Sequence, residues 1–345
     1  MNISNETLNT NSYSNQTISV FHTALITFAS LGTIFNLIVC WVIFSRHQKH
    51  TLDLLIGQLA LTDLFSALAT VSAYVMHLLF KSNRAISWLA REIICKLSSS
   101  STSVGVINSK LVLMAISLER YRAIIHPLKA PFRRKLIVLG IILMWLISAV
   151  LGGFLGLYHG VSKIDLNSCM LLGSQTEKFA IMIIFECTAG IIPLTVILIS
   201  YIKIMIKICT TKIPTESTST ECQRKQLAKK KHRNQKIAAI LIITLLSSIS
   251  ASLHLINYMI LTIGQFMNTE YKVRPEFHTF LIVSGSLTLC SCVLNPIIYN
   301  FVSTNFKNDM KHMYRYYVRK FSCIRKCSAS FMDKCSESSQ AFNLR

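Results

Sequence analysis

Residues 95–127, CKLSSSSTSVGVINSKLVLMAISLERYRAIIHP, are the stretch that decides the fold. They form a mostly apolar segment that begins with a cysteine and ends in a charged, largely basic sequence. As an α-helix with a rise of about 1.5 Å per residue, the path from Cys95 to Arg120 is roughly 37 Å long. A hydrocarbon core is about 30 Å thick, so the stretch predicts a tilted membrane helix with Cys95 at one face and Arg120 at the other.

The composition of the whole chain is that of a membrane protein. Hydrophobic residues make up 52% of the 345 residues, the mean hydropathy is +0.47, and there are 12 Gly and 6 Pro. These values are typical of packed membrane helices and not of a soluble domain. The formal net charge of +21 does not indicate a nucleic-acid partner, because the basic residues lie in short runs between apolar spans.

Six other apolar runs are also long enough to cross a membrane. With the central stretch they predict seven spans, near residues 20–44, 54–80, 95–125, 136–158, 179–208, 237–263 and 277–302. We therefore predict an all-α membrane protein whose residues 20–302 form a seven-transmembrane helix bundle. An odd number of spans places the two termini on opposite sides of the membrane.

The distribution of Lys and Arg predicts the orientation of the bundle. Arg46 and Lys49, the loops at residues 120–135 and 207–236, and the tail after Ser303 together hold 26 basic residues, against 8 in the alternate connections. Cytoplasmic loops carry the excess of basic residues in membrane proteins. We therefore expect a plasma-membrane protein with its N-terminus outside and its C-terminus in the cytoplasm.

Residues 1–19 are polar, contain no Lys or Arg, and carry three N-glycosylation sequons, at Asn2, Asn5 and Asn15. Three sequons in a tail without basic residues favour a glycosylated extracellular N-terminus. The first apolar run, residues 20–44, is long enough to remain as a membrane anchor instead of being removed as a signal peptide.

The C-terminal region has two parts. Residues 303–321 place apolar side chains at helical spacing among basic ones, which predicts a short amphipathic eighth helix in the cytoplasmic interface of the membrane. Residues 322–345 are expected to form a cytoplasmic tail. Cys323 and Cys327 follow the amphipathic helix, where palmitoylation and plain unmodified cysteines are equal alternatives.

Two of the eleven cysteines are candidates for a disulfide bond. Cys95 and Cys169 lie near the extracellular ends of spans, where an oxidising compartment would join them. Other cysteines in or at the ends of apolar spans are expected to be small core residues. These are Cys40, Cys187, Cys209, Cys290 and Cys292.

Motifs along residues 20–321 are linked in a recognisable order. The third span ends in Glu119-Arg120-Tyr121, and the seventh contains Asn295-Pro296-Ile297-Ile298-Tyr299. Other spans and their flanks carry Asn36, Asp63 within Leu59-Ala60-Leu61-Thr62-Asp63, Trp88, Trp145, Pro193, Tyr201 and Phe306. This set closely resembles the rhodopsin-like (class A) G-protein-coupled receptors, and among them the receptors for peptides.

The resemblance implies a switch at the inner end of the third span. Glu119 would hold Arg120 in the inactive receptor, and release of Arg120 would open a cytoplasmic cleft for a helix of a heterotrimeric G protein. Tyr201 and Tyr299 would move inward to support the open state, and Tyr121 belongs to the same motif. Arrestin is a further partner that the resemblance implies. A snorkelling interfacial arginine would explain Arg120 but not the motif around it.

Asp63 lies at the middle of the membrane, where a bare carboxylate is costly and so marks a partner, an ion or a proton. By resemblance Asp63 would bind an allosteric sodium ion together with Ser109, Asn295 and Ser291, and no other cofactor is expected. Pro296 removes a backbone hydrogen bond inside the seventh span and gives that helix a place to bend.

The sixth span departs from the family pattern, which places Phe and then Cys-Trp-x-Pro along it. At the aligned positions this chain has no proline and carries Ser248, Ala251, Ser252, Leu253 and His254. Any bend would therefore come from serine hydroxyls that bond to the backbone. His254 is expected to be a hydrogen-bonded core residue and not a pH sensor. Whether such a helix supports normal activation is open.

Lys110 is the second departure, because the family has an aliphatic residue at this depth of the third span. An unpaired ammonium is costly there, so Lys110 should be deprotonated, hydrated or paired. Two acidic partners are available, Asp63, where Lys110 would replace the sodium ion, and Glu186 on the fifth span. A wet cavity around Lys110 is the third alternative.

A receptor is the expected function. Transporters usually show paired broken helices or repeated halves, channels show a filter or a ring of charges, and enzymes show a catalytic motif, and this sequence shows none of them. A small polar or lipid ligand and a weakly or constitutively signalling receptor remain alternatives, and a membrane transporter is a distant one. The basic inner loops would contact anionic membrane lipid.

A peptide is the expected extracellular ligand, because the outer loop around Cys169 is long enough to form a hairpin lid pinned to Cys95. Charged residues of both signs are also expected on the outer surface, namely Arg84, Arg91, Asp165, Glu177 and Glu270. By resemblance, the ligand would contact residues near Thr102, Glu186, Asn257 and His278.

Overall fold

The computed structural model describes five long stretches and a set of scattered positions beyond them. These are residues 3–45, 51–82, 86–130, 132–161 and 169–210, followed by 245, 249, 252, 256, 259, 260, 263, 264, 267, 283, 293–296, 310, 311, 314 and 315. The chain forms two compact units, Met1–Val302 and Ser303–Arg345. In the second unit the described residues are helical, at positions inside the predicted eighth helix.

Five helices in the described part of the first unit are long and apolar enough to cross a membrane. Four are α1 (Ile3–Phe44), α2 (Thr51–Ser82), α3 (Trp88–Ile125) and α4 (Arg134–Leu157), and the fifth is built from α5 (Gln175–Glu186), η1 (Cys187–Ile191) and α6 (Ile192–Thr210). They correspond to the first five predicted spans. The sixth and seventh predicted spans lie almost entirely outside the described residues.

All the described helices of the bundle begin before the predicted spans, and α1 and α3 do so by the largest margins. α1 is helical from Ile3, although only Ile26–Phe44 has the hydropathy of a membrane span. α3 begins at Trp88, because Ser87 caps it there: the Ser87 hydroxyl accepts a hydrogen bond from the Ala90 backbone N–H at 3.3 Å. An N-cap serine satisfies one of the unpaired donors at a helix start and so fixes where the helix begins.

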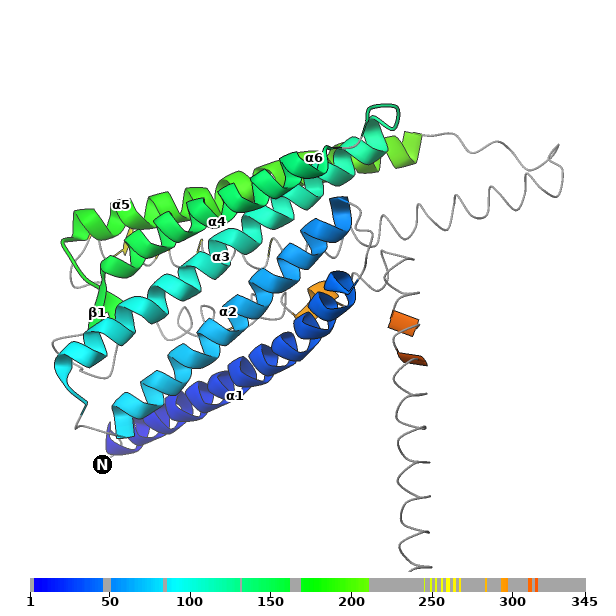
Figure 1. The fold of residues 1–345 in the computed structure, drawn as a ribbon. Coiled ribbons are helices and arrows are strands. Elements are labelled where there is room, and N and C mark those ends of the chain that lie inside the picture. Colours follow the sequence, from blue (N-terminus) through cyan, green and yellow to red (C-terminus); the bar gives the residue numbers. More distant parts are fainter. Residues whose placement is uncertain are drawn as a thin grey trace, which may run out of the picture. The chain divides into compact units, whose positions relative to one another are not determined.

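α3 lies at the centre of the first unit. It packs against α2, α4, α6 and the strand β1 (His159–Val161), and Figure 1 shows α1, α2, α3 and α4 lying side by side. A helix surrounded in this way must satisfy its polar groups internally. Asn108 of α3 is fully buried and donates to the Thr62 hydroxyl of α2 at 3.1 Å, which ties these two helices together.

Glycines bring the outer half of α4 close to α3. A Cβ on Gly152 would lie 2.7 Å from the Val104 backbone N, and a Cβ on Gly156 would lie 2.9 Å from the Lys96 carbonyl oxygen. Gly153, between them in sequence, has nothing within 4 Å of the same position. The spacing of Gly152 and Gly156 is the one that lets membrane helices approach at backbone distance.

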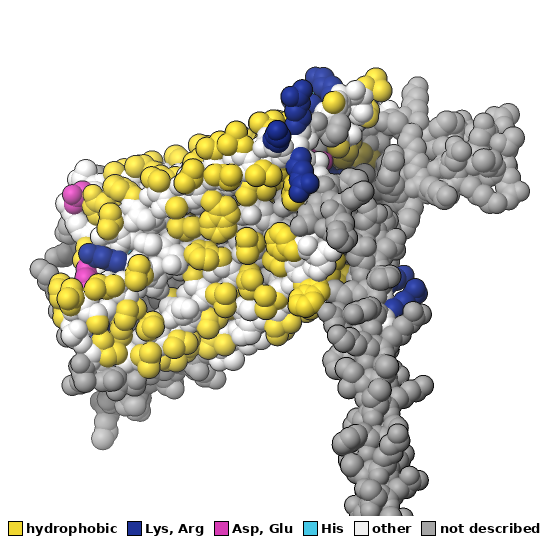
Figure 2. Space-filling view, viewed as in Figure 1, with side chains coloured by type: hydrophobic (Ala, Val, Ile, Leu, Met, Phe, Trp, Pro, Cys, Tyr) yellow, Lys and Arg dark blue, Asp and Glu magenta, His cyan; other side chains and the backbone are white. Residues whose placement is uncertain are grey.

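The outward faces of the helices are apolar. Large hydrophobic side chains are exposed along α1, α4 and α6, and Figure 2 shows hydrophobic atoms spread over the visible face. Lys and Arg side chains gather toward one end of that face. The exposed residues Lys129, Arg133, Arg134 and Lys135 lie at the loop between α3 and α4. An apolar belt with basic residues at one end is the arrangement that a membrane-embedded bundle requires.

The fifth span is interrupted by one wide turn. η1 is a π-helical segment, and the N–H of Ile192 donates to the Cys187 carbonyl across it. Pro193 follows directly and has no backbone N–H, so it cannot continue the regular hydrogen-bonding ladder of the helix. The wide turn absorbs this break.

A hairpin consists of β1 (His159–Val161) and β2 (Cys169–Leu171). The strands are antiparallel, with His159 opposite Leu171 and Val161 opposite Cys169. The hairpin predicted around Cys169 is thus confirmed, while its role as a lid stays a prediction. Asp165, which was expected on the outer surface, lies outside the described residues.

Candidate functional site

The outer end of α3 holds both strands of the hairpin. A disulfide joins Cys95 to Cys169 of β2, with Cα atoms 5.7 Å apart, as predicted. One turn earlier on α3, Glu92 accepts a hydrogen bond from the Val161 N–H of β1 at 2.8 Å, and its other oxygen lies 3.1 Å from the Lys96 ammonium. The hairpin is therefore fixed to one helix by a covalent bond and a charged hydrogen bond.

Arg91 was expected on the outer surface, and this expectation is wrong. Its side chain is only 5% exposed. Its guanidinium donates to the carbonyls of Phe80 and Ile86, both at 3.2 Å, and stacks 5.0 Å from the Phe80 ring centroid. Arg91 therefore joins the end of α2 to the start of α3, because five donors on one planar group can bind several backbone acceptors. Glu177 is exposed as expected and caps α5 through Ser174.

Two of the four expected ligand contacts lie in the described part of the chain. The Thr102 hydroxyl donates to the Ser98 carbonyl at 3.0 Å. Glu186 is 4% exposed, and no hydrogen bond or ion pair to it is found in the described part of the chain. Asn257 and His278 lie outside the described residues, so the structure does not test whether the four share one pocket.

The depth of Glu186 follows from the packing of η1. Ala189 packs with Ile107 and Leu111 of α3 in one buried cluster, and Phe185 covers that cluster. α3 and the fifth span run in the same direction through the membrane, so Glu186, one turn before Ala189, lies outward of this contact. It is therefore on the same outer half of the bundle as Thr102.

Asp63 joins three helices at the centre of the bundle. Its side chain is 1% exposed, and its two carboxylate oxygens accept hydrogen bonds from the Ser109 hydroxyl at 3.1 Å and from the Asn295 amide at 2.7 Å. Ser109 comes from α3 and Asn295 from the seventh predicted span, where residues 293–296 are helical. Ser291 lies outside the described residues. The structure thus brings together three of the four residues expected at a sodium site.

The Lys110 side chain on α3 is 7% exposed. Between the described Lys110 and Glu186 the structure places no ion pair. The expectation that Lys110 pairs with Asp63 or with Glu186 therefore stays a prediction.

At the inner end of α3, Glu119 and Arg120 form an ion pair, with Nε 3.2 Å from Oε2. The side chains are 17% and 32% exposed. Among the described residues Glu119 Oε2 has no hydrogen-bond donor, so within this part of the chain the pair is held by charge alone. Tyr201, the expected support of the switch, is buried on α6. Tyr299 lies outside the described residues.

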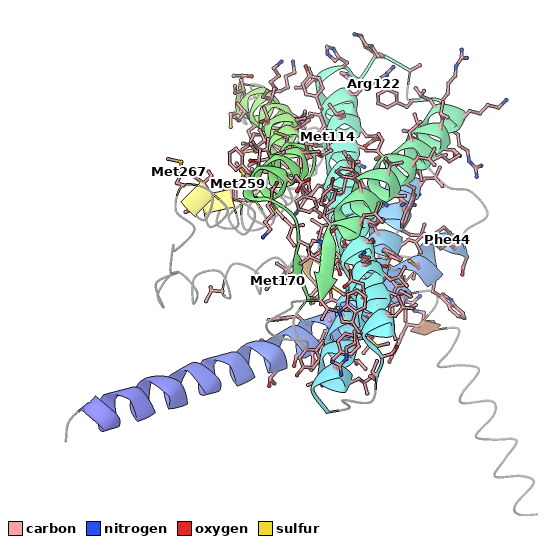
Figure 3. The ribbon with its side chains drawn as sticks, turned by 90° about the vertical axis from the view of Figure 1, so that its left-hand side faces the viewer. Phe44, Met114, Arg122, Met170, Met259 and Met267 are labelled. Carbon is pink, nitrogen blue, oxygen red and sulfur yellow. A yellow bond between two sulfur atoms is a disulfide. The ribbon has the colours of Figure 1, made fainter. Side chains whose placement is uncertain are left out.

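Arg122 is a functional candidate that the sequence reasoning did not single out. It donates to the Ala130 carbonyl at 2.7 Å and stacks 4.1 Å from the centroid of the Phe132 ring, which organises the loop after α3. Figure 3 shows Arg122 toward the opposite end of α3 from the hairpin that carries Met170. The sequence did contain a signal for these contacts: Arg122 is a basic residue in the last turn of the helix, and an aromatic residue, Phe132, follows after a turn.

The family described as "7 transmembrane receptor (rhodopsin family)" matches residues 35–299, which run from the first predicted span to the end of the seventh-span motif. The chain belongs to this family. It is therefore a multi-pass membrane receptor of the plasma membrane with seven spans, and not an enzyme. The resemblance inferred from the linked motifs is confirmed.

Individual relatives are distant but extend over most of this receptor. It is 23% identical over 319 residues to the pyroglutamylated RF-amide peptide receptor of Rattus norvegicus. That alignment covers 86% of this chain and 68% of the rat protein. It is 27% identical to the G-protein coupled receptor homolog Q2/3L of Sheeppox virus (81% and 69% covered) and 25% identical to neuropeptide Y receptor type 6 of Mus musculus (81% and 76% covered).

Proposed function

We propose that this receptor binds an extracellular peptide and activates a heterotrimeric G protein when the inner ends of the fifth and sixth helices move away from α3. The observation that carries the proposal is the contrast along α3. One end of this helix anchors an extracellular hairpin covalently, and the other ends in the loosely held pair Glu119–Arg120. Relatives named as receptors for RF-amide and neuropeptide Y peptides support the peptide class.

The ligand would enter beneath the hairpin and reach Thr102 and Glu186, with Asn257 and His278 completing the pocket. Glu186 favours a ligand that carries a cationic group. In the described part of the chain no hydrogen bond or ion pair to this buried carboxylate is found, and an incoming guanidinium or ammonium would supply such a partner. The peptide would thus be held by charge at depth and covered by the hairpin above.

Ligand binding would shift a two-state bundle toward the form in which Arg120 leaves Glu119. Tyr201 and Tyr299 would then support the open inner cleft, and Asn295 with Pro296 would let the seventh helix bend. Bound G protein would raise agonist affinity in return, because coupling between two sites is reciprocal. Arrestin would use the same inner surface.

The termini, the modification sites and the basic loop residues would be placed according to an orientation with the hairpin outside the cell. The N-terminus would lie outside, with glycans on Asn2, Asn5 and Asn15, and the C-terminus would lie in the cytoplasm. Cys323 and Cys327 would carry palmitoyl groups beyond the amphipathic helix. These positions lie outside the residues whose side chains are described, so the proposal for them comes from the sequence alone. The exposed basic residues after α3 would contact anionic lipid.

A receptor that signals weakly or without agonist is the second candidate. The observation that favours it is the sixth span, which contains no proline and has Ser252 buried in a helix where the family has a different sequence. A helix without a fixed kink has a different balance between its closed and open positions. His254, the neighbour expected in the core, lies outside the described residues.

The test is a G-protein activation assay on the full receptor in cells, with a panel of amidated peptides that contain arginine and the same peptides with citrulline. Wild-type receptor should respond to an arginine peptide, and Arg120→Ala should abolish the response at equal surface expression. Glu186→Gln should reduce the preference for arginine over citrulline. Absence of any response across the panel, or full signalling by Arg120→Ala, would contradict the proposal.

A further inference from the structure

We propose that the outer edge of β2 is where a peptide binds this receptor, by adding itself to the hairpin as a third, extended strand. The site rests on the proposed peptide-receptor function and adds to it the part of the receptor that recognises the peptide backbone. Its evidence is the direction in which the backbone groups of the two strands point.

The register of the hairpin shows which backbone groups pair between the strands. β1 and β2 are antiparallel, with Gly160 opposite Met170. Just beyond the strands the Leu172 N–H donates to the Tyr158 carbonyl at 2.6 Å, so these two opposite residues form a hydrogen-bonded pair. Bonded and non-bonded pairs alternate along an antiparallel ladder, so Gly160 and Met170 form the next bonded pair.

The residues of the non-bonded pairs turn their backbone groups away from the partner strand. Val161 of β1 confirms this, because its N–H donates to the Glu92 carboxylate of α3 at 2.8 Å. Its opposite residue, Cys169, therefore directs its N–H and C=O away from β1, and so does Leu171, two residues further on. β2 thus presents two N–H and two C=O groups on an edge with which no strand in the described part of the chain pairs.

The two edges of the hairpin differ in exposure. In β1, Gly160 and Val161 are buried, and Glu92 binds the outer edge. In β2, Cys169 and Met170 are exposed, Met170 at 44%. Unpaired backbone groups on an exposed strand are the template on which extended peptides bind by strand addition. An extended peptide is therefore the partner whose chemistry this edge matches.

The edge of β2 also lies close to the carboxylate proposed to bind the charge of the peptide. Leu171 packs against the buried cluster that contains Ile181 and Met182 of α5, and Phe185 packs against the same cluster. Glu186 follows Phe185 directly and lies about 7.5 Å along the helix from Ile181. An extended strand covers about 7 Å in two residues. One peptide can therefore pair with β2 and present a cationic side chain to Glu186.

The first experiment measures amide hydrogen exchange at single residues of the purified full-length receptor. Without peptide, the amides of Met170 and Leu172 should exchange slowly because they pair with β1, and that of Leu171 should exchange roughly tenfold faster or more. An amidated arginine hexapeptide that activates the receptor in the panel above should slow exchange at Leu171 to the rate of its neighbours. Slow exchange at Leu171 before the hexapeptide is added, or an unchanged rate afterwards, would overturn the proposal.

The second experiment removes one donor of the edge. Leu171→Pro deletes the outward N–H, which is a position where an edge strand tolerates proline, and leaves the bonds between β1 and β2 in place. Leu171→Ala is the matched control, because it loses the same packing against the α5 cluster but keeps the N–H. The hexapeptide should bind Leu171→Pro about tenfold more weakly than Leu171→Ala. Equal affinities would contradict strand addition.

N-methylation of the hexapeptide tests the same pairing on wild-type receptor, whether or not the two variants are recovered. Methyl groups on alternate amides should weaken binding about tenfold, and those between them should have little effect, because every second residue of the added strand faces β2. A flat response along an activating hexapeptide would overturn strand addition and leave the proposed function standing. Absence of activation by every peptide of the panel would overturn both.

Discussion

The two ends of α3 are held in different ways. At the outer end a disulfide, the Glu92 hydrogen bond to Val161 and the buried Arg91 fix the helix to β2, β1 and α2. At the inner end the Glu119–Arg120 pair is partly exposed and lacks hydrogen-bond geometry. The difference indicates that the outer end is an anchor against which a ligand can act, while the inner end is free to change partners.

The largest expected effect comes from removing the covalent anchor. Cys95→Ala should release β2 from α3 and lower the free energy of unfolding by about 2–5 kcal/mol, because the disulfide closes a long loop. Thermal unfolding of purified receptor and antibody staining at the cell surface measure it. Cys209→Ala, at an exposed free cysteine, is the control and should change neither. Equal stability of the two variants would show that the hairpin does not depend on the disulfide.

The next effect concerns the glycines that bring α4 onto the outer half of α3. Gly156→Leu should lower stability by about 1–3 kcal/mol, since its side chain would overlap Ser100 and the Lys96 carbonyl. Gly153→Leu, one turn away on the open face, and Gly140→Leu, in the inner half of α4, should be nearly neutral because nothing lies within 4 Å of either position. A loss at Gly140 as large as that at Gly156 would contradict the view that the outer half is the tightly packed one.

A smaller change in stability, but a clear change in signalling, is expected at the inner end. Glu119→Gln removes the charge that holds Arg120 and should cost less than about 1 kcal/mol, because the pair is partly exposed. Basal nucleotide exchange on the G protein should rise relative to wild type at equal receptor density. Arg133→Gln, an exposed basic residue just beyond the helix, is the control. Unchanged basal exchange in Glu119→Gln would mean that this pair does not restrain the inactive state.

The smallest expected effect is a pH dependence at the outer end. Burial lowers the pKa of His159 below its ordinary value, although its hydrogen bond with the Leu155 carbonyl acts in the opposite direction. The unfolded chain therefore binds the proton more readily, and stability should fall as the pH drops through about 6.5 and level off below the folded pKa. The Tm of His159→Gln should no longer fall in this pH range. Identical profiles of Tm against pH for the variant and the wild type would show that His159 does not cause the pH dependence.

The comparison also shows which features the sequence could predict. The first five spans, the hairpin and the Cys95–Cys169 disulfide follow from hydropathy and from two cysteines at span ends. Asp63, Ser109 and Asn295 meet as the motifs implied. These features depend on local composition or on a family pattern, so they are visible without coordinates.

Other features depend on contacts between distant segments. Arg91 is buried because its guanidinium donates to the carbonyl of Phe80 on the preceding helix, and the sequence around Arg91 does not reveal that acceptor. The hydrogen bond of Glu92 with Val161 is of the same kind. By contrast, the spacing of Gly152 and Gly156 was visible in the sequence and was not used. The partner of Lys110 stayed open in the sequence because a long, flexible side chain can reach several acids.

The central claim is that a ligand held at the anchored outer end opens the loosely held inner end. The most direct measurement is the distance between spin labels at Ala123, exposed on the last turns of α3, and at Lys236, at the start of the sixth predicted span. Adding an activating arginine peptide together with G protein should lengthen this distance in wild type and leave it unchanged in Cys95→Ala. An unchanged distance in wild-type receptor that activates its G protein would contradict the account.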